Sequence, residues 1–248
     1  MSTSKNEKVR AQTVVYTVGN GLYVNITNAC TNRCDFCIRN NGDGAYGSDS
    51  LWLMREPTLD EITAAIAAND PTRYSEVVFC GYGEPTCRLD VLIAAARYIK
   101  STYPTVPVRL NTNGQADLIA GKSTASLFGG LFDVISISLN APDSEGYDAV
   151  CHSVYGKAAF GAVLDFARAV KEYVPECVFS VVGDFLTGEQ ISVCFPSLEY
   201  IKAKLVSLAE LGFAGVFIDI DKLDIRYLTM FNAAFRRADY ELKERYIF

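Results

Sequence analysis

Three cysteines lie close together near the start of the sequence, in the stretch Cys30-Thr-Asn-Arg-Cys34-Asp-Phe-Cys37. A loop that folds back on itself brings three such thiolates to one face of a metal centre. Cysteine thiolates hold iron–sulfur clusters, and a cubane of four irons needs four ligands. Because the motif offers three, one iron would stay open to a small molecule, like the open position of catalytic zinc sites. The spacing therefore predicts an iron–sulfur cluster with one open iron.

The same cysteines leave two other interpretations open. One is three free thiols in a surface loop, since free cysteine often acts as a small hydrophobic residue. The other is a zinc site, which pairs C-x2-C with a second pair of cysteine or histidine ligands. The sequence shows no such second pair, and its one histidine is His152. The flanking residues argue against simple core packing because they are polar: Asn28, Asn32, Arg33 and Asp35.

The composition is that of a folded globular protein. The chain has 248 residues, of which 50% are hydrophobic, and a formal net charge of −6. This is enough apolar material for a sizeable core. The acidic balance argues against a long nucleic-acid interface, which depends on neutralising phosphates. We expect one domain over residues 13–248, preceded by a flexible tail over residues 1–12.

The sequence predicts no membrane contact. It has no run of about 18 apolar residues, and its first residues lack the apolar core of a signal peptide. Without a signal peptide, eight cysteines are typical of a reducing compartment, where thiols stay free or bind metal. We therefore expect a cytoplasmic protein.

Apolar strands alternate with helical segments along the chain, which predicts an α/β fold with a parallel sheet. Right-handed crossovers wind such a sheet into a barrel or a doubly wound sheet. Thr58-Leu-Asp-Glu61 is a capping box that opens the first helix. The expected strands cover residues 14–18, 22–27, 76–80, 106–111, 133–139, 177–182 and 215–220, and the expected helices residues 58–69, 89–103, 116–128, 156–173, 198–211 and 223–237.

Polar residues follow several of these strands, at the sheet edge where barrels of this kind do their chemistry. In Gly81-Tyr-Gly-Glu-Pro85 the glycines allow the backbone to approach a ligand, and the carboxylate of Glu84 suits a cationic amine. Asn113 ends the third strand of the parallel series, and Ser138 and Asn140 end the fourth. An ordinary turn, or a strand with a polar face, would explain the same residues.

These motifs resemble those of the radical S-adenosylmethionine (SAM) superfamily. Its signature is CxxxCxxC with an aromatic residue before the last cysteine, a place that Phe36 fills. The glycine motif is similar to the superfamily's GGEP, with Tyr82 in place of the second glycine. The resemblance implies a partial (β/α)6 TIM-like barrel and a [4Fe–4S] cluster on Cys30, Cys34 and Cys37. It also implies that SAM is held by Phe36, Gly81, Tyr82, Gly83, Glu84, Pro85, Asn113, Ser138 and Asn140.

Within the superfamily, the sequence is most similar to the TatD family-associated radical SAM proteins. The likeness runs from about Tyr16 to Val182 and includes Asn25–Asn28, Cys37–Asn40, Leu51–Leu53 and Glu56-Pro57. The part of the chain from about residue 194 diverges from that pattern.

The resemblance implies an enzyme that reductively cleaves SAM to a 5′-deoxyadenosyl radical, which abstracts hydrogen from an unidentified substrate. That substrate is a small molecule or a partner protein, and a flavodoxin or ferredoxin would supply the electron. A functional link to a TatD-type hydrolase is also implied. The long loop from Asn40 to Trp52 is expected to form part of a lid. A non-catalytic iron–sulfur redox module or a zinc-binding protein would use the same cysteines, but neither needs a pocket for an amino acid.

Four further side chains are candidates for chemistry or for structure. His152 is either a proton donor or a hydrogen-bonded structural residue. Arg39, Arg88 and Arg109 either meet an anionic group of the substrate or lie in ordinary ion pairs.

Overall fold

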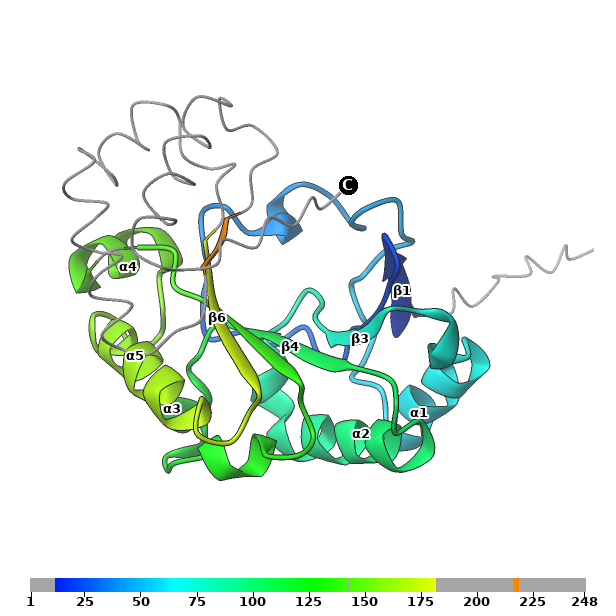
Figure 1. Ribbon diagram of the computed structural model, residues 1–248. Coiled ribbons are helices and arrows are strands. Elements are labelled where there is room, and N and C mark those ends of the chain that lie inside the picture. Colours follow the sequence, from blue (N-terminus) through cyan, green and yellow to red (C-terminus); the bar gives the residue numbers. More distant parts are fainter. Residues whose placement is uncertain (1–11, 142, 182–215, 219–248) are drawn as a thin grey trace, which may run out of the picture.

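A curved sheet, with its strands in the order of the chain, forms the centre of the fold (Figure 1). The structure is a computed structural model that describes residues 12–141, 143–181 and 216–218. The described strands are β1 Val15–Val18, β2 Gly21–Val24, β3 Glu76–Phe79, β4 Val108–Thr112, β5 Val134–Ser138, β6 Glu176–Val181 and β7 Val216–Ile218. Strands β2 to β7 are parallel, and each lies beside its predecessor. The winding never reverses, so the sheet is a partial barrel and not a doubly wound sheet, as predicted.

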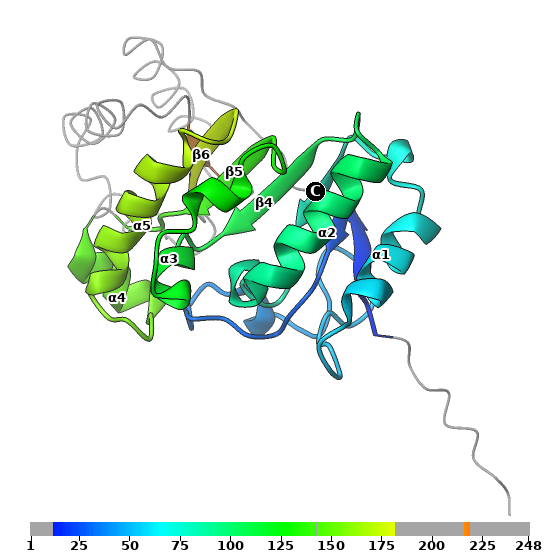
Figure 2. The same ribbon diagram turned by 90° about the horizontal axis from the view of Figure 1, so that it is seen from below.

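The helices lie on the outer side of this sheet (Figures 1 and 2). They are α1 Leu59–Ala68, α2 Leu89–Thr102, α3 Ala116–Ala120, α4 Ser144–Cys151 and α5 Ala158–Val170. Short 3-10 turns lie in the segments between the strands and helices: η1 Ile38–Asn40, η2 Pro71–Arg73, η3 Pro85–Arg88 and η4 Ala125–Phe128. No helix in the described part of the chain is both long enough and apolar enough to cross a membrane.

The core between the sheet and the helices is apolar and partly aromatic. All four residues of β3 are buried, as expected for a strand covered on both faces. Phe128 packs its ring against Phe132 and Phe166, each at a centroid distance of 5.6 Å. Phe132 in turn meets Phe79 of β3 edge-on at 6.0 Å. Such tilted and edge-on pairs stabilise a core beyond the area that they bury.

The hairpin at the start of the sheet is confirmed. Strands β1 and β2 pair antiparallel, with Val18 opposite Gly21. The connection is therefore the two residues Gly19 and Asn20, and Gly19 has a φ of +53°. A two-residue loop of this kind favours residues that tolerate positive φ. Strand β2 also pairs parallel with β3, so the cysteine loop that follows β2 leaves the sheet at the carboxyl edge.

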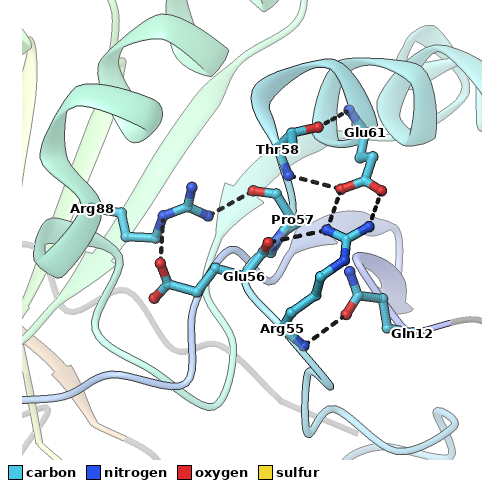
Figure 3. Close-up of polar contacts among 7 residues, drawn as sticks. All are labelled: Gln12, Arg55, Glu56, Pro57, Thr58, Glu61 and Arg88. Atoms are coloured by element: carbon cyan, nitrogen blue, oxygen red, sulfur yellow. Dashed lines mark hydrogen bonds and ion pairs between the residues drawn. The ribbon is translucent and has the colours of Figure 1, made fainter.

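The predicted capping box at the start of α1 is confirmed (Figure 3). Thr58 Oγ1 accepts a hydrogen bond from the Glu61 backbone N–H at 3.2 Å, and the Glu61 carboxylate accepts one from the Thr58 N–H at 2.8 Å.

We expect Thr58→Ala to lower the free energy of unfolding by about 1 kcal/mol, because it leaves an N-terminal amide of the helix without its acceptor. Urea denaturation monitored by circular dichroism measures this. Thr63→Ala, at a half-buried position of the same helix that makes no contact with its cap, is the matched control and should change the free energy of unfolding by less than about 0.5 kcal/mol. Equal losses in both variants would contradict the role of the cap.

The predicted helix over residues 116–128 is wrong in its middle. Helix α3 ends at Ala120, because Gly121 adopts a left-handed conformation with a φ of +65°. The carboxylate of Asp117 then accepts hydrogen bonds from the backbone N–H and hydroxyl of Thr124, both at 2.7 Å. These contacts turn the chain into the separate 3-10 turn η4.

Helix α4 was not among the predicted elements. It has eight residues, of which Tyr147 and Cys151 are buried. The predicted strand over residues 215–220 corresponds to β7. Apart from β7, the described residues do not include Val182, the two helices predicted near the C-terminus or the segment from about residue 194. They also do not include the tail over residues 1–11.

Candidate functional site

The three cysteines lie on the loop that follows β2, at the carboxyl edge of the parallel strands. All three are partly exposed. The loop turns back on itself, because Cys37 N–H donates to Cys34 O at 3.1 Å, and η1 follows directly. The segments after β3 and β4 leave the sheet at the same edge, as parallel strands require. The structure thus brings the cysteine loop, Glu84 and Asn113 together.

A partly exposed ion pair between Arg88 and Glu56 fixes the chain where it leaves β2 (Figure 3). Arg88 donates to Ile26 O and to Pro57 O, each at 2.8 Å, and its Nε lies 3.1 Å from the Glu56 carboxylate. Glu56 also accepts a hydrogen bond from the Thr27 hydroxyl at 2.7 Å. The guanidinium therefore ties the exit of β2 to the segment before α1.

The other two candidate arginines also have protein partners. Arg109 of β4 pairs with Glu76 of β3 at 2.8 Å, with both side chains about nine-tenths buried. Arg39 donates to Asn28 O at 3.1 Å and lies over the ring of Trp52 at 5.5 Å. The ion-pair and packing interpretation of these arginines is the one that the structure supports.

The glycines of the Gly81–Pro85 segment fit it against the cysteine loop. A Cβ on Gly83 would lie 2.3 Å from Thr27 O and 2.6 Å from Ala29 O. A Cβ on Gly81 would lie 2.1 Å from the side-chain oxygen of Asn25. The sequence predicted a close approach to a ligand here, and the structure shows a close approach to the protein's own chain. The backbone N–H of Glu84 completes the contact by donating to Ala29 O at 2.8 Å.

Glu84 is buried and its carboxylate already accepts four hydrogen bonds. Oε1 accepts from the Thr86 N–H at 3.0 Å and from the hydroxyls of Thr86 and Thr112 at 2.7 and 2.8 Å. Oε2 accepts from the Asn113 N–H at 2.7 Å. Burial raises the pKa of Glu84, and these four donors oppose the shift. Glu84 thus clamps η3 to the end of β4, and the predicted bond to an amine of SAM would compete with these donors.

Asn113 connects the end of β4 to the cysteine loop. Its Nδ2 donates to the Thr31 hydroxyl at 2.8 Å, and its Oδ1 accepts from the Gln115 N–H at 3.0 Å. Thr31 lies next to Cys30, so the side chain of Asn113 positions the loop directly. A contact between Asn113 and SAM stays a prediction.

The remaining predicted SAM contacts lie around the same edge. Ser138 ends β5 and is 3.4 Å, oxygen to oxygen, from Ser180 of β6. Asn140 follows it with a φ of +51°. Pro85 is buried and opens η3, and Phe36 is partly buried and packs against the main core. Their contacts with SAM stay predictions.

Tyr82, which replaces the second glycine of the GGEP-type motif, anchors the loop that follows the cysteines. It is buried, donates from its hydroxyl to Gly42 O at 2.7 Å and meets the ring of Trp52 edge-on at 5.1 Å. Burial raises its pKa, so the hydroxyl stays protonated and donates at neutral pH. The side chain of Asn28 holds the far end of that loop, because it exchanges two hydrogen bonds with the backbone of Leu53 at 2.8 and 3.1 Å.

The environment of the Cys30 and Cys34 thiols favours their neutral form until a metal binds. Burial, with the nearby charge of Glu84, raises the pKa of Cys30 to about 11. A hydrogen bond with Cys151 and burial raise the pKa of Cys34. Ligation replaces these protons, so a metal that binds here must displace them.

The donors available in the loop fit an iron–sulfur cluster. They are the thiols of Cys30, Cys34 and Cys37, and thiolates suit iron–sulfur clusters. Within residues 12–141, 143–181 and 216–218, no three His, Cys, Asp or Glu side chains converge as they would around a single metal ion.

His152 holds the cysteine loop to α4. Its Nε2 lies 2.8 Å from the Asp35 carboxylate. The backbone N–H groups of Arg33 and Asp35 donate to Cys151 O and Val150 O, both at 3.0 Å. His152 thus has the hydrogen-bonded structural role that was one of its two interpretations.

Sequence reasoning missed a buried polar network behind the cysteine loop. It contains Asn32, Gln115, Tyr147 and Ser153. Asn32 and Tyr147 are 115 positions apart in the sequence. No local pattern links them, so the sequence alone carried no signal for the network.

Comparison with known proteins points to one family. The sequence model of the radical SAM superfamily matches residues 24–195. Two curated relatives, from Rhodococcus opacus and Rhodococcus jostii, are each described as a probable dual-specificity RNA methyltransferase RlmN. Each is 30% identical over 152 residues, a match that covers 56% of this chain and 38% of the relative. The chain thus spans well under half the length of these relatives.

Solved structures share the fold at low sequence identity. A radical SAM methyltransferase from Sphaerobacter thermophilus superposes with a TM-score of 0.62 at 16% identity, covering 94% of this chain and 68% of the other. The structure of anSMEcpe with bound AdoMet has a TM-score of 0.54 at 18% identity, covering 90% of this chain and 62% of the other. Both likenesses support the partial barrel.

Proposed function

The chain belongs to the radical SAM superfamily, and on that premise we propose that Cys30, Cys34 and Cys37 hold a [4Fe–4S] cluster whose open iron binds SAM. When bound, the two cofactors supply reductive cleavage of SAM to a 5′-deoxyadenosyl radical, which abstracts hydrogen from a substrate. The protein contributes binding, orientation and the exclusion of water.

One observation carries the proposal. The three thiols lie on a loop at the carboxyl edge of a parallel partial barrel, and the ends of β2, β3 and β4 fix that loop. Catalytic residues of barrels come from the ends of several different strands at this edge. A loop held from three strands keeps its thiols in place when a ligand binds beside them.

In this proposal, SAM lies along the ends of β3, β4 and β5. It is surrounded by the backbone of three residues of the glycine motif and by five side chains. The backbone groups are those of Gly81, Gly83 and Pro85, and the side chains are those of Phe36, Tyr82, Asn113, Ser138 and Asn140. Glu84 acts through its clamp on Asn113 and η3, because its oxygens already accept four hydrogen bonds. Tyr82 and Trp52 hold the loop over residues 40–52 next to the site, where it would shield a radical from water.

The test is anaerobic reconstitution of the full chain with iron and sulfide, followed by reduction and electron paramagnetic resonance (EPR) spectroscopy with and without SAM. We expect a signal of a reduced [4Fe–4S] cluster whose shape changes on adding SAM. A cluster indifferent to SAM would favour the non-catalytic redox module. Bound zinc with no cluster would overturn the proposal.

We expect serine at Cys30, Cys34 or Cys37 to abolish the cluster, because a hydroxyl replaces a thiolate ligand. Iron and sulfide content per chain should fall about tenfold or more, as expected when the ligand set is lost. Cys177→Ser is the matched control, since Cys177 is a buried thiol of β6 outside the cysteine loop. Full iron content in the three loop variants would contradict the assignment.

The finer assignment also belongs to this proposal. Asn25, Asn28 and Glu56, whose contacts help to fix the exit of β2, are residues on which the likeness to the TatD family-associated group rests. We place the chain in that group, as one domain over residues 13–248 that works in the cytoplasm. Its electron donor is a flavodoxin or ferredoxin, its substrate is a small molecule or a partner protein, and its functional link is to a TatD-type hydrolase.

A further inference from the structure

A buried polar network lies between the cysteine loop, the end of β4 and α4. Its members are Asn32, Gln115, Tyr147 and Ser153, whose side chains are at most 8% exposed. Burying four polar side chains is costly unless they are hydrogen-bonded. The network therefore calls for an explanation beyond core packing.

Asn32 is the member that reaches a sulfur atom of the loop. Its backbone N–H donates to Cys30 Sγ at 3.4 Å. Its side-chain amide donates to Tyr147 OH at 3.1 Å. The backbone of Asn32 thus supplies a hydrogen bond to one of the three thiols, and its side chain anchors that backbone in the network.

The rest of the network fixes how Asn32 points. Gln115 Nε2 donates to Asn32 Oδ1 at 2.8 Å, and the amide nitrogen of Asn32 donates to Tyr147 OH at 3.1 Å. Gln115 donates to the same Tyr147 oxygen at 3.1 Å and accepts from the Ser153 hydroxyl at 3.0 Å. Ser153 accepts in turn from the Tyr155 N–H at 3.2 Å, so its own proton is available for Gln115.

We infer that Asn32 is a positioning residue that raises the reduction potential of the cluster, and that Gln115 holds it in the required orientation. The inference rests on the proposed cluster at Cys30, Cys34 and Cys37. Reduction adds one negative charge to the cluster, and hydrogen bonds to the ligating sulfurs stabilise the more negative form. Removing or displacing a donor should therefore make the cluster harder to reduce.

The test is a redox titration of the reconstituted full chain, followed by EPR spectroscopy. Asn32→Leu removes, at similar volume, the side-chain hydrogen bonds that hold the Asn32 backbone N–H against Cys30 Sγ. We expect the ratio of reduced to oxidised cluster at a fixed potential to fall about tenfold, which is a shift of about −59 mV for one electron. Asn69→Leu, the same change at a half-buried site on the far side of the fold at the end of α1, is the control and should leave the potential unchanged.

Gln115→Met provides a second variant that leaves Asn32 and all three cysteines intact. It removes the donor that orients Asn32, so we expect a smaller shift in the same direction. Unchanged reduction potentials in both variants would overturn the inference. The proposed function would still stand in that case, provided that the wild-type chain takes up its cluster. A wild-type chain that takes up no cluster would overturn the proposed function, and the inference with it.

Discussion

Replacing Glu84 by alanine will lower the free energy of unfolding by about 3–5 kcal/mol. The change leaves the Thr86 and Asn113 N–H groups and two hydroxyls without their acceptor in a buried place, and each such group costs about 1–3 kcal/mol. The sum is reduced because hydroxyls rotate and water enters the space left by the carboxylate. Urea denaturation measures the loss, and Glu172→Ala, at an exposed position, should change it by less than about 0.5 kcal/mol.

Glu84→Gln separates the clamp from a direct contact with SAM. The amide keeps the shape of the side chain but places an N–H₂ group against donors. If Glu84 acts as a clamp, the variant should have a free energy of unfolding lower by about 2 kcal/mol. Wild-type stability combined with weaker SAM binding would contradict the clamp and favour the direct contact that the sequence predicted.

The second large effect is expected from Gly83→Ala. The added methyl group would lie 2.3 Å from Thr27 O and 2.6 Å from Ala29 O, and both are backbone atoms that cannot move without displacing the cysteine loop. Overpacking of this kind costs about 1–3 kcal/mol and sometimes more. We expect a loss near the upper end, together with a severalfold fall in iron content after reconstitution.

Gly161→Ala is the matched control for this substitution. Gly161 lies in α5, and no atom beyond its chain neighbours and its own helix backbone comes within 4 Å of its added Cβ. Alanine in a helix interior is more favourable than glycine by about 0.5–1 kcal/mol, so this variant should become more stable. A Gly83→Ala protein as stable as wild type would contradict the tight packing of the glycine motif against the loop.

The fold could be predicted well because its signals are local. The capping box at Thr58, the turn at Gly19-Asn20 and the apolar runs of the strands each depend on neighbours in the sequence. The errors have physical causes. The sequence did not show that Gly121 adopts a left-handed conformation, which ends α3. Helix α4 was missed because it is short, and its two buried residues do not form a clear helical period.

The site was predictable only in part, for a different reason. The motifs placed the cysteine loop, Glu84 and Asn113 at one edge of the sheet, because the order of parallel strands fixes that edge. They could not show where each side chain points. The carboxylate of Glu84 faces Thr86, Thr112 and the Asn113 N–H, and no sequence pattern distinguishes that orientation from one toward a ligand.

The contacts between the cysteine loop and α4 have a consequence for the order in which the site is made. Asn32 meets Tyr147 across 115 positions and Asp35 meets His152 across 117, so these contacts close a very long segment of chain. Closure of long segments is slow, and a ribosome delivers the N-terminal part first. The three thiols therefore leave the ribosome well before the residues that fix their loop, and they spend that interval unsupported. Metal delivery to this chain is best timed after residue 153 has emerged, when α4 and the residues after it can contact the cysteine loop.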